Sequence, residues 1–113
     1  MITRMNAKTT EPLKLTAMII KRYLPDVKLI IGESFAIPGV KAVDETWFPA
    51  FDEYRYAAKE IAKSLDAVFV PYQQVFDKAQ KEAPGIYWTY DGVHASLAGA
   101  QLMAHAWMEA VNA

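Results

Sequence analysis

The clearest chemical signal in the sequence is an aspartate and a histidine three positions apart, Asp91 and His94, just before a C-terminal apolar stretch. A histidine that acts as a general base needs one defined ring tautomer, and a carboxylate that accepts a hydrogen bond from Nδ1–H provides it. The Asp-x-x-His spacing lets one tight turn supply both groups and leaves Nε2 directed at a hydroxyl. Gly92 gives this turn freedom in φ. The pattern predicts a proton-transferring pair.

An ordinary turn is the alternative interpretation of these residues. Asp91 and Gly92 would then only reverse the chain, and His94 would cap the last helix. Because a bare Asp-x-x-His often occurs by chance, the elements that position the pair have to be considered as well.

Hydrophobic periodicity predicts the order helix, strand, helix, strand, helix, helix. We expect helices at residues 11–24, 47–65, 72–83 and 97–111, strands at 27–31 and 67–70, and loops at 34–46 and 84–95. Pro12 would lie in a first helical turn and Ser96 would be the N-cap of the last helix. The predicted inward face of that last helix consists of Leu97, Ala100, Ala104, Trp107 and Val111.

This order is typical of an α/β fold with a parallel sheet. Both strands are short apolar runs, as in strands buried on both faces. Two such strands alone would leave open edges and uncovered faces. We therefore expect residues 1–113 to form a single partial domain of about two strands and four helices, completed by another segment or another chain.

The segment Asp91-Gly-Val-His94-Ala-Ser-Leu-Ala-Gly99 closely resembles the last conserved block of SGNH/GDSL hydrolases, which commonly reads Asp-Gly-Val-His-Pro-Thr-x-x-Gly. Position 95 is Ala instead of the usual Pro. Residues 29–35, 38–39, 51–55, 67–71 and 104–107 are also similar to that family. The resemblance extends from about Glu11 to the end and corresponds to the C-terminal half of such enzymes, a three-layer, flavodoxin-like fold.

The resemblance implies cleavage of acyl or acetyl esters, including carbohydrate esters, by a serine nucleophile without cofactor or metal. His94 would be the general base and Asp91 would orient it. The family's nucleophile lies in a Gly-Asp-Ser block, and its oxyanion hole uses a separate glycine and a Gly-x-Asn-Asp block that this sequence lacks. We therefore expect the chain to be inactive alone and to need a missing N-terminal half or the strands of a homo-oligomer.

Gly32-Glu33-Ser34 looks like a Gly-Asp-Ser block that carries a conservative change. The family's nucleophile opens the fold, however, whereas Ser34 follows a later strand, so we interpret Ser34 as a loop hydroxyl. Glu33, Ser34 and Trp88 are candidates for lining a substrate pocket. His105 has no spaced metal-ligand partner, which favours a surface or core-edge position over a metal site.

Composition narrows the other possibilities. The chain has 113 residues, 53% of them hydrophobic, and a formal net charge of −1, which provides no field for nucleic acid or an anionic membrane. It contains no cysteine and no apolar run near the roughly 18 residues that span a bilayer. Any targeting signal would lie upstream of a fragment, so the compartment is not predicted.

Two other classes of function compete with the hydrolase. A degenerate or truncated family member could serve as a non-catalytic binding or assembly module. A small flavodoxin-like cofactor domain is the weakest alternative, because the sequence has no Gly-rich phosphate loop.

Overall fold

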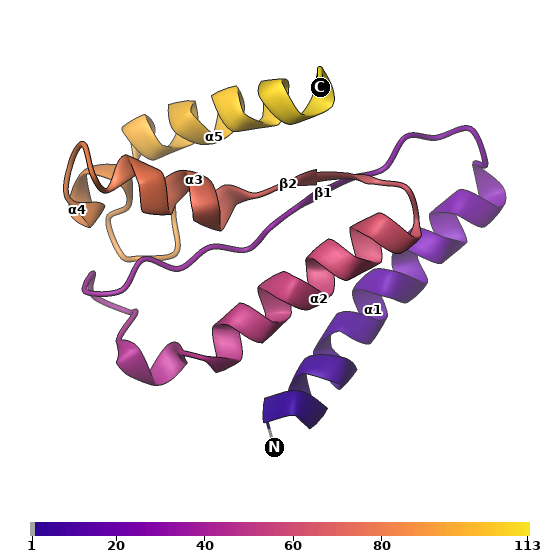
Figure 1. Ribbon diagram of the computed structural model, residues 1–113, viewed down its shortest axis with the longest axis horizontal. Helices are drawn as coiled ribbons and strands as arrows, with labels where there is room; N and C mark the ends of the chain where they lie inside the picture. Colours follow the sequence, from indigo (N-terminus) through magenta and orange to yellow (C-terminus); the bar gives the residue numbers. More distant parts are fainter. Residues whose placement is uncertain (1) are drawn as a thin grey trace.

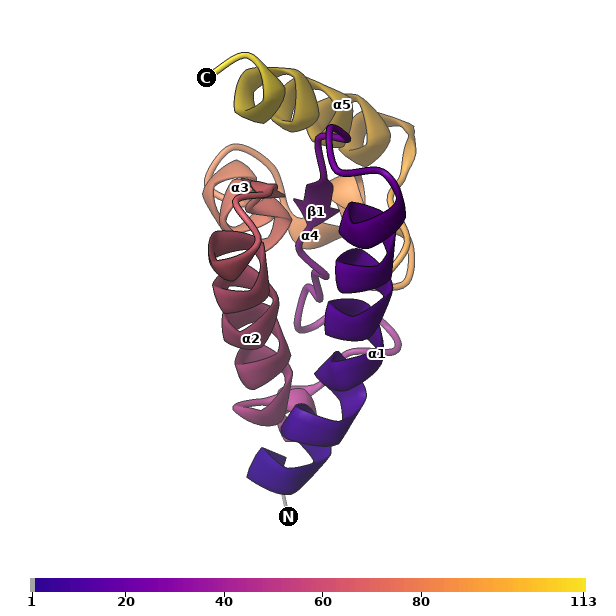
Figure 2. The same ribbon diagram turned by 90° about the vertical axis from the view of Figure 1, so that its right-hand side faces the viewer.

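The computed structural model describes residues 2–113, with side chains from Glu11 onward, and it has the expected α/β order. The elements are α1 (Ile2–Tyr23), β1 (Ile30–Gly32), a 3-10 helix η1 (Glu45–Trp47), α2 (Ala50–Ser64), β2 (Val68–Val70), α3 (Tyr72–Ala79), α4 (Gly85–Trp88) and α5 (Leu97–Val111). In Figures 1 and 2, α1 and α2 lie side by side on one side of the strands and α5 lies on the other. The arrangement is a small three-layer α/β unit, and the predicted fold class is confirmed.

The sheet consists of β1 and β2, which pair in parallel with Ile30 opposite Val68 and Gly32 opposite Val70. Both strands are rich in β-branched residues, isoleucine in β1 and valine in β2. Such side chains favour the extended backbone because a helix restricts their χ1 angles. Helix α2 makes the crossover that a parallel pair requires. Both strands therefore end at the same edge of the sheet, and the segments that follow them meet there.

Two clusters of buried side chains hold the layers together. One joins the strands to α2 and contains Ile31, Ile61 and Ala62, with Leu65, Ala67 and Phe69 packed around them. The other lies beyond the strand ends and contains Ile37, Val40 and Phe76, with Phe35, Trp88, Leu102 and Met103 around them. The second cluster anchors the loop after β1 against α3 and α5.

Several predicted boundaries were wrong. α1 begins at Ile2, so Pro12 lies inside the helix and not in its first turn. Its missing N–H leaves one carbonyl of the preceding turn without its helical partner, but the surrounding turns continue the helix. α2 begins at Ala50 because Pro49 stands at its N-cap, and Trp47 belongs to η1.

The predicted count of four helices was also wrong, because residues 2–113 contain five α-helices. The additional helix, α4, is a single turn inside the segment predicted as loop. Such a turn is too short to show hydrophobic periodicity, and only the preceding Pro84 marks its start.

The inward face of α5 was predicted incorrectly. Leu97 is 79% exposed and Trp107 is 39% exposed, whereas Gly99 and Ala106 are buried. Gln101, His105 and Glu109 recur every four residues and form a polar stripe, and the buried Gly99 and Ala106 lie outside it. The rest of the helix is apolar, so the stripe alone did not define which face packs inward. Close contact at Gly99 sets the rotation, because a Cβ there would lie 2.1 Å from the carbonyl oxygen of Trp88.

The strands are less covered than their sequences predicted. Ile30, Val68 and Phe69 are only partly buried, and Gly32 is exposed. Within residues 2–113, each helix is too short or too polar to cross a bilayer.

Candidate active site

Asp91 and His94 lie in the loop between α4 and α5, and the structure brings their side chains together. The distance between His94 Nδ1 and Asp91 Oδ2 is 2.6 Å. An ionised carboxylate can only accept, so this hydrogen bond places the proton on Nδ1. The His94 side chain is 67% exposed and that of Asp91 is 24% exposed. The imidazole is therefore held by its Nδ1 side while most of the ring remains accessible.

The other carboxylate oxygen closes the turn. Asp91 Oδ1 accepts from the backbone N–H of Val93 at 2.9 Å and from that of His94 at 2.8 Å. The hydrogen bond from the His94 ring is the main cause that lowers the pKa of Asp91 to about 2, and these backbone hydrogen bonds add to it. Asp91 is therefore an anion at neutral pH, which is the form that orients and stabilises an imidazolium.

Gly92 is required by the backbone of this turn. Its φ is +99°, and a Cβ at this position would lie 2.7 Å from Val43 Cγ2 and 2.8 Å from the carbonyl oxygen of Val40. The left-handed conformation and the close approach of the loop after β1 both exclude a side chain. The predicted need for a glycine here is confirmed.

Thr89 braces the loop from inside, a role that the sequence analysis did not identify. Its side chain is fully buried, and its hydroxyl donates to the carbonyl of His94 at 2.6 Å. The same oxygen accepts from Gly92 N–H at 2.9 Å, and Thr89 pairs with Ala95 in an antiparallel bridge. The only sequence signal for this role was that Thr89 lies two positions before Asp91, and that signal is weak.

Tyr90 is a second residue that the sequence analysis missed. Its ring stacks on the His94 imidazole, with 5.9 Å between centroids and 11° between planes. Tyr90 is 57% exposed, so this aromatic surface and the imidazole face solvent together.

The start of α5 completes the loop. Ser96 is the N-cap, as predicted, and its hydroxyl accepts from Gly99 N–H at 3.1 Å while donating to the carbonyl of Tyr87 at 2.7 Å. These contacts fix the beginning of α5 relative to α4. The histidine therefore lies between two anchored points, Thr89 and Ser96.

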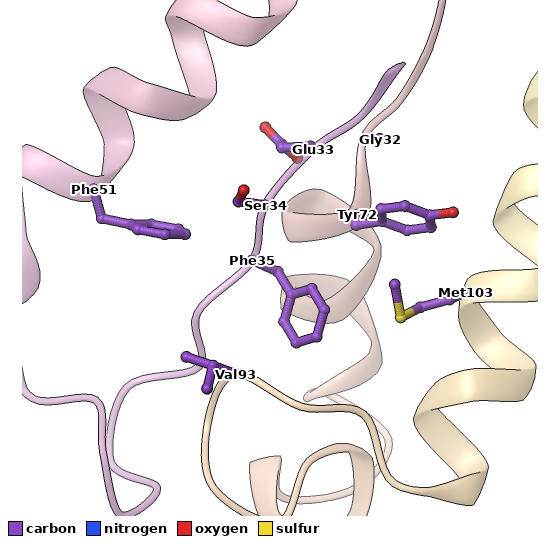
Figure 3. Close-up of a pocket in the computed structure, with 8 residues that line it drawn as sticks. All are labelled: Gly32, Glu33, Ser34, Phe35, Phe51, Tyr72, Val93 and Met103. Carbon is purple, nitrogen blue, oxygen red and sulfur yellow. The ribbon is translucent and has the colours of Figure 1, made fainter. Parts of the chain in front are cut away.

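Ser34 lies at the end of β1 in a pocket of about 410 Å³. Figure 3 shows Glu33 and Ser34 on this segment, Phe51 approaching from α2, Val93 from the Asp91–His94 loop and Met103 from α5. No hydrogen bond joins Ser34 to His94 within the part of the chain that the structure describes. The arrangement favours a loop hydroxyl over a nucleophile already paired with the base.

Glu33 also borders this pocket, but its carboxylate is buried and paired. Oε2 lies 3.1 Å from Arg55 Nε, and Oε1 accepts from Gln73 N–H at 2.9 Å. Arg55 also bonds Asp52 at 2.7 Å. Desolvation alone would lower the pKa of Arg55, but the hydrogen bonds and charges of Asp52 and Glu33 together raise it. This environment favours a structural role for Glu33 over contact with substrate.

Trp88 packs into the second core cluster. Its indole N–H is shared between the carbonyls of Ala79 and Ala83, each at 3.1 Å. The ring therefore connects the end of α3 to the start of the loop that carries Asp91 and His94. These contacts support a packing role and leave its predicted place in a substrate pocket as a prediction.

His105 lies on the exposed surface of α5, where its Nε2 is 3.2 Å from Glu109. Among the described residues, no group of three or more potential metal-binding side chains comes together. The histidine position agrees with the surface interpretation.

Solved structures resemble this arrangement. A GDSL-like lipase from Parabacteroides merdae superposes with a TM-score of 0.87 at 40% sequence identity, over 88% of this chain and 46% of its own. The resemblance to GDSL-type hydrolases is confirmed. At this identity the likeness concerns the part of the lipase that this chain covers.

More distant structures share the fold. A Geobacillus acetyl-xylooligosaccharide esterase has a TM-score of 0.69 at 24% identity, and the match covers 87% of this chain and 44% of the esterase. An alpha/beta hydrolase from the metagenome of Lake Arreo has a TM-score of 0.70 at 23% identity, with coverages of 85% and 44%. Neither a protein-family model nor a curated protein matches the chain. The chain spans just under half the length of these solved relatives.

Proposed function

We propose that residues 1–113 are a partial domain, the C-terminal half of a serine ester hydrolase, which supplies the general base and its orienting carboxylate. The observation that carries this proposal is the 2.6 Å hydrogen bond from His94 Nδ1 to Asp91 on an otherwise accessible ring. The 40% identity to a GDSL-like lipase supports the same reaction class.

In the complete enzyme, Nε2 of His94 would accept the proton of a serine hydroxyl as the oxygen attacks the ester carbonyl. Asp91 would stabilise the resulting imidazolium, and His94 would then give the proton to the leaving alcohol. The low pKa of Asp91 suits this role, because the carboxylate stays ionised throughout.

We expect the chain alone to be inactive or nearly so. The resemblance assigns the nucleophile and the oxyanion donors to blocks that this sequence does not contain. Removing a single oxyanion donor already costs about 10²–10³-fold in kcat in such enzymes. The accessible base would therefore have no serine to activate.

The missing half would cover apolar surface that this chain leaves exposed. On α1, Ile19 is 56% exposed and Tyr23 is 74% exposed, and on α5 Leu97 is 79% exposed. The outer edge of β1 would receive the next strand of a wider sheet, since β1 pairs only with β2 among the described residues.

A small acyl or sugar ester is the substrate class that we propose. One relative is named an acetyl-xylooligosaccharide esterase, but at 24% identity this likeness concerns the fold. The acyl part of the proposal is tested by comparing the rates at which the complete enzyme cleaves nitrophenyl acetate and a long-chain nitrophenyl ester. Faster cleavage of the long-chain ester would contradict it.

A chimera tests the proposed function. This chain would replace the matched segment of the Parabacteroides lipase, and nitrophenol release from nitrophenyl acetate would be measured. We expect the folded chimera to be active, His94→Ala to abolish that activity and His105→Ala to leave it unchanged. A folded but inert chimera, or one that tolerates His94→Ala, would contradict the proposal.

The chain alone provides the complementary assay. Esterase activity that disappears in Ser34→Ala would show that the nucleophile lies in this chain, contrary to our interpretation.

A binding or assembly module is the second candidate, favoured by the exposed apolar faces of α1 and α5. It predicts a stable dimer in which partner strands extend the sheet. Size-exclusion chromatography with light scattering distinguishes the two candidates, because a dimer with no activity in either assay would support the module.

A further inference from the structure

Gln73, near the start of α3, is a buried polar residue that the proposed mechanism does not use. It is only 3% exposed, and its amide makes three hydrogen bonds. Oε1 accepts from Ala36 N–H at 2.7 Å, and Nε2 donates to the carbonyl of Ala36 at 3.0 Å and to Asp77 Oδ1 at 3.0 Å. The side chain thus binds both polar backbone groups of one residue, as a neighbouring strand would.

Ala36 belongs to the irregular segment between β1 and η1, and this segment holds the catalytic turn. The next residue, Ile37, donates its N–H to the carbonyl of Gly92 at 2.9 Å. Farther along, Ala42 donates to the carbonyl of Asp91 at 3.1 Å. At its start, Glu33 N–H donates to the carbonyl of Val70 at 2.9 Å. Between that point and the turn, the segment forms no strand pairing among the described residues, and Gln73 supplies the hydrogen bonds of Ala36.

The backbone of Gln73 is itself held by a hydrogen bond to Glu33. Pro71 provides no side-chain cap for α3, and Glu33 Oε1 accepts the Gln73 N–H instead. Arg55 holds the other oxygen of Glu33. A carboxylate at a helix N-terminus also interacts favourably with the helix dipole. The Gln73 backbone is therefore anchored on both β1 and α2.

We propose that Gln73 is a positioning residue for the Asp91–His94 pair. It fixes Ala36, which places the N–H groups of Ile37 and Ala42 against the carbonyls of the turn. This inference rests on the proposed function for its catalytic meaning, but its geometry concerns the turn alone.

The sequence offers a matched pair of variants. Gln73→Met has similar length and no hydrogen-bonding amide, and it would leave both backbone groups of Ala36 buried without their partner. Gln74→Met changes the next residue on the same helix, which is exposed. The chain contains only two histidines, so exposed His105 serves as an internal control in each sample.

Imidazole tautomers can be read from long-range ¹H–¹⁵N spectra of the labelled chain at pH 8. In the unmodified chain and in Gln74→Met, we expect His94 to carry its proton on Nδ1. In Gln73→Met we expect a shift toward the Nε2–H form, with the pKa of Asp91 rising from about 2 toward its ordinary value. His105 should be the same in all three proteins.

A folded Gln73→Met protein with unchanged His94 tautomer and unchanged Asp91 pKa would overturn the proposal and leave Gln73 a purely structural residue. Melting curves for both variants establish that folded protein is compared. The readout needs no substrate, so it stands apart from the chimera assay. An inert chimera with a responsive His94 would refute the proposed function but not the positioning role.

Hydrogen exchange in the unmodified chain tests the same idea if Gln73→Met does not fold. The Ala36 N–H is bonded by Gln73, and those of Ile37 and Ala42 are bonded by the turn. We expect the three amides to exchange with matching protection, because one opening would release them together. If the Ala36 amide exchanges at least tenfold faster than the other two, its hydrogen bond to Gln73 breaks while the bonds of Ile37 and Ala42 to the turn remain. That result would overturn the proposal.

Discussion

The loop between α4 and α5 and the outward faces of α1 and α5 differ in how fully this chain satisfies them. In the loop, both oxygens of Asp91 and the hydroxyls of Thr89 and Ser96 have partners. On the helices, Ile19 and Leu97 remain more than half exposed. The Asp91 carboxylate and the hydroxyls of Thr89 and Ser96 thus have partners within one chain, while the apolar faces of the helices remain uncovered.

This difference has a physical origin. The hydrogen bonds of the turn run between residues close in sequence and to the loop after β1, so this segment can form them without further chains. The apolar outward faces of α1 and α5 can be buried only if another layer of structure packs against them. The turn around Asp91 and His94 is therefore ordered by its own contacts, whether or not another layer covers α1 and α5.

The largest expected effect concerns Asp91. In the active chimera, Asp91→Asn should lower kcat by about 10⁴-fold, because the amide no longer selects the Nδ1–H tautomer or stabilises the imidazolium. KM should change little. The exposed Asp26→Asn is the matched control. Steady-state kinetics on nitrophenyl acetate measures both, and a loss below tenfold would contradict the role of Asp91.

A large effect on stability is expected at Gly99. Alanine normally favours a helix over glycine by about 1 kcal/mol. Here its Cβ would lie 2.1 Å from the Trp88 carbonyl oxygen, so α5 would have to move, at a net cost of about 3 kcal/mol.

Gly39→Ala provides the comparison in urea unfolding. A Cβ at Gly39 meets no atom within 4 Å, although φ is +87°. Its cost should be only that of the left-handed conformation, about 1–2 kcal/mol. A smaller loss for Gly99→Ala than for Gly39→Ala would show that α5 is not locked against α4.

The exposed helix faces should respond differently in the two settings. Ile19→Gln should change the unfolding free energy of the chain alone by no more than about 0.5 kcal/mol. In the chimera, where the face would be buried, the same change should cost about 2 kcal/mol. Lys14→Gln on the same helix is the exposed polar control. Equal effects of Ile19→Gln in both proteins would mean that α1 stays uncovered.

The smallest expected effect is on pH dependence. The pKa of Asp91 is about 2 in the folded chain and near 4 when unfolded. A lowered folded pKa contributes stability that is fully present above about pH 4 and is lost as the pH falls toward 2.

Carbon-detected NMR of the Asp91 carboxyl measures this titration directly, and His94→Ala should raise the pKa because it removes the main hydrogen bond. A midpoint near 4 in the unmodified chain would indicate that the pair does not form in solution.

The sequence was informative where the determinants are local. The Asp91–His94 spacing, Gly92 and the Ser96 cap lie within six positions, and the structure shows the contacts that this spacing suggested. The α/β order was also predictable, because strand and helix periodicities differ clearly.

The contacts that the sequence analysis missed join distant positions. Gln73 meets Ala36 and Glu33 across 37 and 40 residues, and no local pattern marks such a pair. The predicted face of α5 was wrong because the helix is apolar everywhere outside the polar stripe of Gln101, His105 and Glu109, and the close contact that fixes the helix comes from Trp88 on another element. Tertiary contacts, more than propensity, determined these features.

The bridge between Thr89 and Ala95 closes the base of the loop that carries the pair. Chain length can consequently vary outside this base, for example in the exposed turn after α3, without changing the separation of carboxylate and imidazole. An insertion between positions 89 and 95 would disrupt it at once. Relatives with longer connections should therefore keep this short stretch constant in length while their surroundings diverge.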